Sequence, residues 1–223
     1  MTTSGAYAVR LYVNGEPNDV VVDDHFPYDP RPEKDCWFFS RDTTENEIWV
    51  QILEKAYAKM FGSYEIVEGG KPYQALCNLT GFPSDLLHHD EINGDALWKI
   101  IYKGACRDQP MVGSVNSVEL GQSEAIKTKG LADHHAYTIL NAITVIDEND
   151  KFIRLLKIRN PYGSRAKREW QYRWQDESEA NKRYLSEELG MNDDLDGIFW
   201  MRFDDFERYF YCTTLCHYRD NYQ

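Results

Sequence analysis

The sequence predicts an α+β fold with antiparallel strands, and three observations support this expectation. The dipeptide Asn14-Gly15 separates two short apolar runs, which is a strong signal for a β-hairpin. Apolar residues recur at helical spacing over residues 45–61. Two further apolar runs, 135–146 and 152–159, are separated by the polar turn 147–150 and predict a second hairpin.

The early part of the chain predicts a sheet edge followed by a helix. Residues 6–13 and 20–22 are expected to form strands, and a proline-rich stretch over 27–32 precedes another short strand at 36–39. For the helix over 45–61, Thr44 and Glu47 have the spacing of a capping box, and Gly62 is expected to end it.

The middle of the chain carries weaker signals. Residues 69–72 predict a loop, and the stretch 76–95 is mixed enough that only short turns are expected there. A brief helix is expected over 95–103 and a strand over 111–118. The stretch 119–129, which is rich in Gly, Gln and Lys, predicts a mobile surface loop.

Length and charge limit the class of protein. A chain of 223 residues holds one large domain or two small ones, and 42% hydrophobic with 28% charged residues is typical of a globular protein. The net charge of −12 has the wrong sign for covering phosphates, so we expect no nucleic-acid partner. An acidic surface suits cations or simply solubility, and charge alone does not decide between them.

The expected compartment is the cytosol. No run of apolar residues is long enough to form a transmembrane segment, and the first residues lack the features of a secretory signal. The chain has 5 cysteines, and an odd number favours reduced thiols over a disulfide framework. Cys212 and Cys216 lack the second cysteine pair of a zinc site, so we expect them in a core or an interface.

The second predicted hairpin places a histidine beside an asparagine. Counting outward from the turn brings His135 and Asn160 opposite each other, to within about two residues, at the open end of the hairpin. An asparagine oxygen bound to one ring nitrogen holds the imidazole's tautomer and leaves the other nitrogen free to take a proton from a thiol. The alternative is a purely structural hydrogen bond, which on geometry alone is the commoner reason for such a pair.

Several segments resemble, in order and spacing, the calpain family of calcium-dependent cysteine proteases. In the second half of the chain they are Gly130-Leu131-Ala132-Asp133-His134-His135-Ala136-Tyr137, Arg159-Asn160-Pro161-Tyr162-Gly163, Glu169-Trp170 and Trp174-Gln175-Asp176. Asn46-Glu47-Ile48-Trp49, Gly62-Ser63-Tyr64-Glu65 and Asp196-Gly197-Ile198-Phe199-Trp200-Met201 also look like the protease core of this family.

The resemblance implies a papain-like cysteine protease fold of the calpain type, divided into two lobes. Residues 1–118 would be the remainder of the first lobe, and residues 119–223 the second. It further implies that His135 is the general base and Asn160 its orienting partner. Two departures stand beside them: His134 replaces a glycine of the family and is expected to crowd the cleft, and Tyr162 replaces the tryptophan that covers the pair.

The nucleophile of this family is not recognisable in these residues. It lies in a Gln, Gly, Asp-Cys-Trp segment on a helix, upstream of the strands that resemble the opening of this chain. Asp35-Cys36-Trp37 copies three letters of that segment, and the order Cys36, His135, Asn160 is the papain order. A nucleophile of this type should start a helix whose dipole lowers the pKa of the thiol, whereas the residues around Cys36 predict a strand, so we expect Cys36 not to be the nucleophile.

Calcium is the cofactor that the resemblance implies, because the family's protease core binds an ion in each lobe through carboxylates and backbone oxygens. For the second lobe the matching positions are Glu169, Asp176 and Asp196, with Asp194 nearby, and Ile198 replaces one family glutamate. The loss of a carboxylate predicts weakened binding. In the first lobe Glu47 matches a ligand position, but the capping box explains it without an ion.

Two functions therefore remain open. The chain is either a portion of a calcium-dependent endopeptidase core, inactive alone and completed by an N-terminal protease segment, or a pseudoprotease. In the second case it would act as a structural or interaction module in a larger assembly such as the cytoskeleton. Its partners would accordingly be protein substrates or binding proteins, and the sequence does not identify them.

Overall fold

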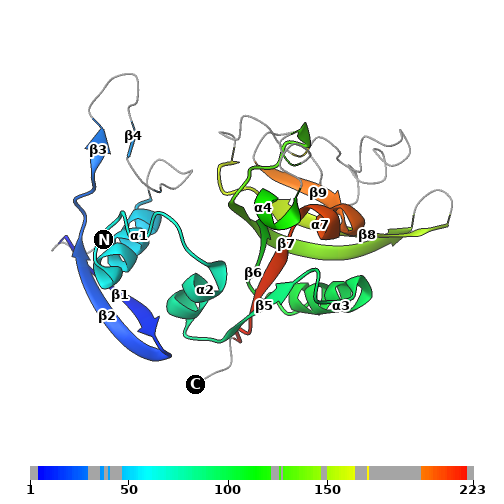
Figure 1. Cartoon of the computed structure of the whole chain (residues 1–223). Helices are drawn as coiled ribbons and strands as arrows, with labels where there is room; N and C mark the ends of the chain where they lie inside the picture. Colours follow the sequence, from blue (N-terminus) through cyan, green and yellow to red (C-terminus); the bar gives the residue numbers. More distant parts are fainter. Residues whose placement is uncertain are drawn as a thin grey trace. The chain divides into compact units, whose positions relative to one another are not determined.

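The computed structural model describes residues 5–29, 36–37, 40, 47–121, 126, 128–146, 150–163, 170 and 197–219. Contacts between Cα atoms divide the chain into two compact units, Met1–Phe82 and Pro83–Gln223. Both combine antiparallel strands with helices (Figure 1), which agrees with the predicted α+β class.

The first unit contains the predicted N-terminal hairpin. Strands β1 (Ala6–Val13) and β2 (Glu16–Asp23) pair in an antiparallel register that closes with Val13 opposite Glu16. Asn14 and Gly15 both have positive φ, at 54° and 83°, as a tight hairpin turn requires. Two residues of β3 (Tyr28–Asp29) pair with β4 (Cys36–Trp37) in a separate ladder.

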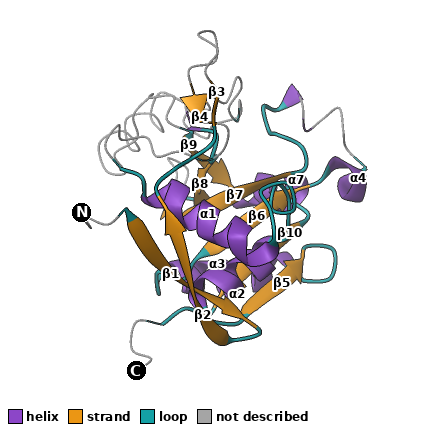
Figure 2. Cartoon of the chain, turned by 90° about the vertical axis from the view of Figure 1, so that its left-hand side faces the viewer, coloured by secondary structure: helices purple, strands orange, loops and turns teal. Residues whose placement is uncertain are grey.

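In the described part of this unit, the helices α1 (Trp49–Phe61) and α2 (Pro72–Thr80) accompany the hairpin. Ile52 and Ala56 of α1 are buried in one small core with Leu11 of β1 and Val22 of β2. Figure 2 shows α1 alongside the two strands. Burial of this apolar stripe, rather than helix propensity alone, stabilises a helix of this length.

The start of α1 differs from the prediction. The helix begins at Trp49 after the non-helical Ile48, which makes no side-chain cap, so the predicted start at residue 45 and the capping box are wrong. Glu47 instead accepts a hydrogen bond from the Trp49 indole at 3.2 Å. The first apolar side chain of α1 that is buried in the small core is Ile52, so packing does not require the helix to begin at residue 45. At the other end Gly62, with φ 120°, ends the helix as predicted.

The second unit is built on a six-stranded antiparallel sheet of order β5-β10-β6-β7-β8-β9. The strands are β5 (Ser84–His88), β6 (Met111–Val115), β7 (His135–Ile146), β8 (Phe152–Arg159), β9 (Ile198–Arg202) and β10 (Cys212–Cys216). The bounds of β7 and β8 are those predicted. Between them the register shifts by a bulge at Leu140, because Ile139 faces Ile158 while Asn141 faces Lys157.

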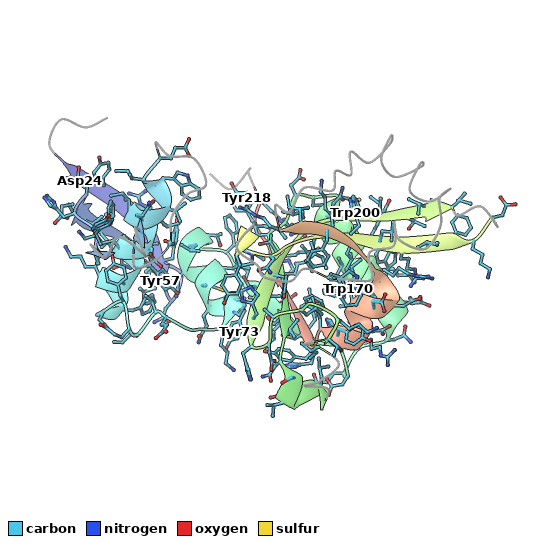
Figure 3. All side chains as sticks on the ribbon, turned by 90° about the horizontal axis from the view of Figure 1, so that it is seen from above. Asp24, Tyr57, Tyr73, Trp170, Trp200 and Tyr218 are labelled. Carbon is cyan, nitrogen blue, oxygen red and sulfur yellow. The ribbon has the colours of Figure 1, made fainter. Side chains whose placement is uncertain are left out.

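Among the helices of the described residues, α3 (Gly94–Ala105), α4 (Ser117–Leu120) and α7 (Phe203–Tyr209) accompany the sheet. Residues of α3 and α7 join alternate sheet residues in the main core, where the rings of Trp98 and Phe203 meet edge to face at 5.2 Å. Figure 1 shows α3 along the β7–β8 hairpin. Trp170, which is labelled in Figure 3, is also buried in this core. Its ring lies 5.5 Å from that of Tyr209 on α7.

The opposite face of the hairpin carries a second cluster. Val145, Ile153, Leu155 and Trp200 pack together there, whereas Leu156 belongs to the main core. Neighbouring residues of a strand point to opposite faces, so this part of the sheet is apolar on both.

The middle of the chain is more regular than the sequence predicts. Within 76–95, where only turns were expected, α2 and β5 form. Pro72 at the start of α2 and Gly81 at its end are the local signals, but no side chain of α2 is fully buried, which explains the weak periodicity. The strand predicted over 111–118 ends at Val115, because Asn116 caps α4. Ile126 is buried, so the stretch 119–129 is not wholly a surface loop.

The division by contacts falls after Phe82, earlier than the lobe boundary that the sequence analysis places after residue 118. Strands β5 and β6 both pair with β10, which ties residues 83–118 to the six-stranded sheet. None of the four cysteines whose side chains are described, Cys77, Cys106, Cys212 and Cys216, forms a disulfide, and Cys212 and Cys216 are buried as predicted. Within the described ranges, no helix is long and apolar enough to cross a membrane.

Acid should destabilise the second unit through the buried His89. Burial lowers the pKa of this imidazole from 6.5 to about 4, while the backbone oxygens of Phe210 and Glu207 offset part of the cost. Its Nε2 lies 2.8 Å from the Thr213 hydroxyl. The unfolded chain therefore binds the proton first, and we expect the unfolding free energy to fall by about 3 kcal/mol at most as pH drops from 6.5 to 4.

Urea unfolding across this pH range would measure the effect. In His89→Gln the dependence should become flatter, because a glutamine keeps a polar partner for Thr213 but does not titrate. His88→Gln, at the half-buried neighbouring histidine, is the control for the substitution itself and should flatten the dependence less than His89→Gln. An unaltered slope in His89→Gln would refute this assignment.

Candidate functional site

The structure brings His135 and Asn160 together, as the hairpin geometry predicted. His135 is the first residue of β7 and Asn160 directly follows β8. The imidazole Nε2 lies 3.0 Å from the carboxamide Oδ1. The β7–β8 ladder positions the two backbones, so the pair stands at the open end of the longest hairpin in the described part of the chain.

The hydrogen bonds of Asn160 determine the tautomer of His135. Its Oδ1 also accepts from the backbone N–H of Tyr162 at 3.1 Å. A backbone amide can only donate, so the side-chain atom between the two partners is the oxygen, and Nε2 of His135 must carry the hydrogen. The other ring nitrogen, Nδ1, then has a lone pair and can accept a proton.

Asn160 is held by its surroundings as well as by its strand. The residue is 2% exposed, its N–H donates to the Gly197 carbonyl at 2.8 Å, and its carbonyl accepts from Gly163 N–H at 2.9 Å. Pro161 adds no competing N–H to this turn. Gly197 has φ 84°, and a Cβ there would lie 2.8 Å from both the Asn160 carbonyl oxygen and Gly163 Cα. Only glycine fits at this crossing of two backbones.

Aromatic rings cover the imidazole. Tyr162 stacks on His135 with centroids 4.2 Å apart and planes inclined by 21°, and Tyr137 meets it edge-on at 4.9 Å. Burial lowers the pKa of His135, and the hydrogen bond to Asn160 opposes that shift only in part. The imidazole is therefore neutral at pH 7, which is the form that a general base requires.

The structure does not show the other predicted site residues at the His135–Asn160 pair. Glu169, Asp176, Asp194 and Asp196 lie outside the described residues, so their grouping around calcium stays a prediction. Within the described ranges, no three His, Cys, Asp or Glu residues are grouped as a metal site would require. Cys36 lies in the short strand β4 and not at the start of a helix, as the residues around it predict, and its exclusion as the nucleophile stays a prediction.

Sequence reasoning missed the residues that support the pair. Gly197 belongs to a segment already noted, but its contact with Asn160 depends on β9 pairing with β8. Asp133 and Ser117, which hydrogen-bond beside His135, depend on the pairing of β6 with β7. His134 has φ 49°, a conformation that favours the glycine of the resembled family, and its side chain is exposed.

Comparisons with known proteins show which family the chain matches. A family model described as calpain family cysteine protease matches residues 1–217. The chain is 34% identical to Calpain-A of Drosophila melanogaster over 96% of its own length and 26% of that protein. It is 35% identical to the Calpain-1 catalytic subunit of Rattus norvegicus over 96% of its length and 29% of that protein. The chain thus spans less than a third of the length of these relatives.

A structural neighbour is more distant. The solved structure titled as SERA5E from Plasmodium falciparum aligns with a TM-score of 0.34 and 14% identity, covering 81% of this chain and 72% of that one.

Replacing Gly197 should displace Asn160. Gly197→Ala combines a positive φ with a Cβ that contacts backbone atoms, which cannot move aside as a side-chain tip does. We expect a loss of about 2 kcal/mol or more of unfolding free energy and a change in the amide signals of Asn160. Gly121→Ala is the control, since its φ is 62° but nothing lies within 4 Å, and it should cost about 1 kcal/mol. Equal losses in both variants would contradict the crowding argument.

Removing the ring that covers His135 should make the imidazole more basic. Tyr162→Ala exposes the ring to water, so the pKa of His135 should rise toward 6.5, because burial is the main cause of its lowering. Tyr162→Phe keeps the stacking and should leave the pKa near that of the wild type. Histidine NMR titration measures both, and a pKa that stays unchanged in Tyr162→Ala would show that the ring does not desolvate His135.

Proposed function

Because the chain belongs to the calpain family of cysteine proteases, we propose that it forms part of a calpain-type endopeptidase core in which His135 is the general base and Asn160 orients it. The observation that carries the proposal is the 3.0 Å contact from His135 Nε2 to Asn160 Oδ1, an oxygen that also accepts from Tyr162 N–H. This arrangement leaves Nδ1 as the free base.

In this proposal the nucleophile is a cysteine outside these 223 residues, in a segment N-terminal to them or in a second chain. His135 Nδ1 takes the thiol proton, and the thiolate attacks the carbonyl carbon of the scissile peptide bond. The Nε2–H bond to Asn160 holds the imidazolium in place. His135 then gives the proton to the leaving amine, and water releases the acyl group from the sulfur. The substrates are accordingly proteins, cleaved in the reducing cytosol.

We extend the proposal to calcium, through Glu169, Asp176 and Asp196. The family membership and the net charge of −12 support it, and carboxylate oxygens are ligands that calcium prefers. When bound, the ion would fix the segments that carry these carboxylates. Ile198 stands at the first position of β9, where the family has a further carboxylate by resemblance, so the affinity is expected to be weak.

The alternative is a pseudoprotease that uses the same fold as an interaction module, attached for instance to the cytoskeleton. The changes that the resemblance identifies at His134, Tyr162 and Ile198 favour it. Both candidates share the His135–Asn160 geometry, so only activity separates them.

Proteolysis by the full-length gene product tests the proposal. With millimolar calcium we expect cleavage of an unfolded protein such as casein, and a loss of about 100-fold or more in His135→Ala, the range for removal of a general base. Asn160→Ala should cost less, because it removes only the orientation. His217→Ala is the control, since that exposed histidine pairs with Asp85. Activity that survives in His135→Ala would refute the assignment, and a full-length protein with no cleavage at all would support the pseudoprotease.

Titration calorimetry on this chain tests the calcium proposal separately. Weak binding is expected, and Asp176→Asn should abolish its heat because it removes one of few carboxylate ligands. Asp85→Asn, at an exposed carboxylate that is hydrogen-bonded to His217, is the matched control. Absence of heat with Asp176 intact would dismiss the site.

A further inference from the structure

The turn before His135 is held by the carboxylate of Asp133. Its Oδ1 accepts from the backbone N–H of Ser117 at 2.8 Å and from the N–H of His134 at 2.9 Å. Its Oδ2 accepts from the Ser117 hydroxyl at 2.5 Å. The side chain is only 21% exposed, so these bonds are partly shielded from water.

The Asp133–Ser117 contact lies just beyond the end of the β6–β7 ladder. The β6–β7 ladder ends with Val115 opposite His135. Ser117 lies two residues beyond Val115, and Asp133 lies two residues before His135, so the same register places them opposite each other past the end of the ladder. Side-chain hydrogen bonds thus continue the strand pairing where the backbone ladder has ended, next to the imidazole.

The residue between Asp133 and His135 makes this contact necessary. His134 has φ 49°, and a residue with a Cβ pays roughly 1–2 kcal/mol for the left-handed conformation. Its N–H is one of the donors to Asp133. A second tether runs from the N–H of Ala132 to the hydroxyl of the buried Tyr137 at 2.7 Å.

The carboxylate is suited to this role at neutral pH. Burial alone would raise the pKa of Asp133, but the hydrogen bonds from Ser117 and His134 outweigh it and lower the pKa below the usual 3.8. The group is therefore ionised and acts only as an acceptor.

We infer that Asp133 is a positioning residue: by binding Ser117 and the His134 amide it holds the turn in its left-handed conformation and so sets the place of the His135 ring against Asn160. The catalytic meaning of this inference rests on the proposed role of His135 as a base. The glycine that the resembled family has at position 134 would adopt the same conformation without strain, so the dependence on Asp133 is tied to His134 in this chain.

Histidine-labelled NMR of this chain tests the inference without any protease activity, so its result is independent of the proposed function. The chain has 6 histidines, and His135→Gln assigns the relevant signals. In Asp133→Ala we expect His135 to lose its single Nε2–H tautomer and its pKa to rise toward 6.5, as the ring leaves Asn160 and becomes solvated. Asp133→Asn, which keeps one acceptor oxygen, should show a smaller change.

A double variant and a control separate positioning from general stability. Asp133→Ala combined with His134→Gly should restore the tautomer and pKa, because glycine removes the strain that the carboxylate counters. Asp108→Ala is the control. Asp108 also has a positive φ, at 52°, but it lies before Met111, at the end of β6 that is remote from His135. If Asp133→Ala does not fold, Ser117→Ala gives the same measurement. A tautomer and pKa unchanged in Asp133→Ala or Ser117→Ala, with only the unfolding free energy reduced, would overturn the inference, as would failure of His134→Gly to restore them.

Discussion

The hydrogen bond from Nε2 of His135 to Oδ1 of Asn160 is the contact on which the geometry of the candidate site depends. It is informative because the same oxygen accepts from the Tyr162 backbone, which removes the ambiguity of both the amide orientation and the ring tautomer. The orientation of the Asn160 side chain is therefore set by a backbone N–H group. Loss of the local backbone arrangement would therefore alter the acid–base behaviour of His135 even with every functional residue present.

The strand order of the sheet explains how a few residues can position His135. β7 lies between β6 and β8, so His135 has an ordered neighbour on each side: Asn160 at the end of β8, and the Asp133–Ser117 contact beyond β6. Gly197, which precedes β9, supports Asn160 from the next strand along. The site is thus assembled from ladder ends that lie side by side although they are far apart in the sequence.

The sequence predicted the parts of this arrangement that depend on one hairpin. The bounds of β7 and β8 and the nearness of His135 to Asn160 follow from two apolar runs and one polar turn, which are local signals. Gly197 and the Asp133–Ser117 contact depend on pairing between strands whose register no local pattern records. The start of α1 was misjudged because Thr44 and Glu47 match a capping pattern although the buried stripe begins further on. Calcium ligands were assigned through resemblance alone, and they lie outside the described residues.

The bulge at Leu140 has a consequence for how this family member can change. Between the bulge and the His135 end, Ile139 pairs with Ile158. Between the bulge and the turn, the pairing is offset by one residue, so that Asn141 pairs with Lys157. Leu140, which is 43% exposed, absorbs that offset, and the faces on both sides of it remain correct: Ile139 and Ala142 both belong to the main core. Because the bulge separates the two parts of the ladder, the hairpin can change length near its turn while His135 and Asn160 keep their relative positions.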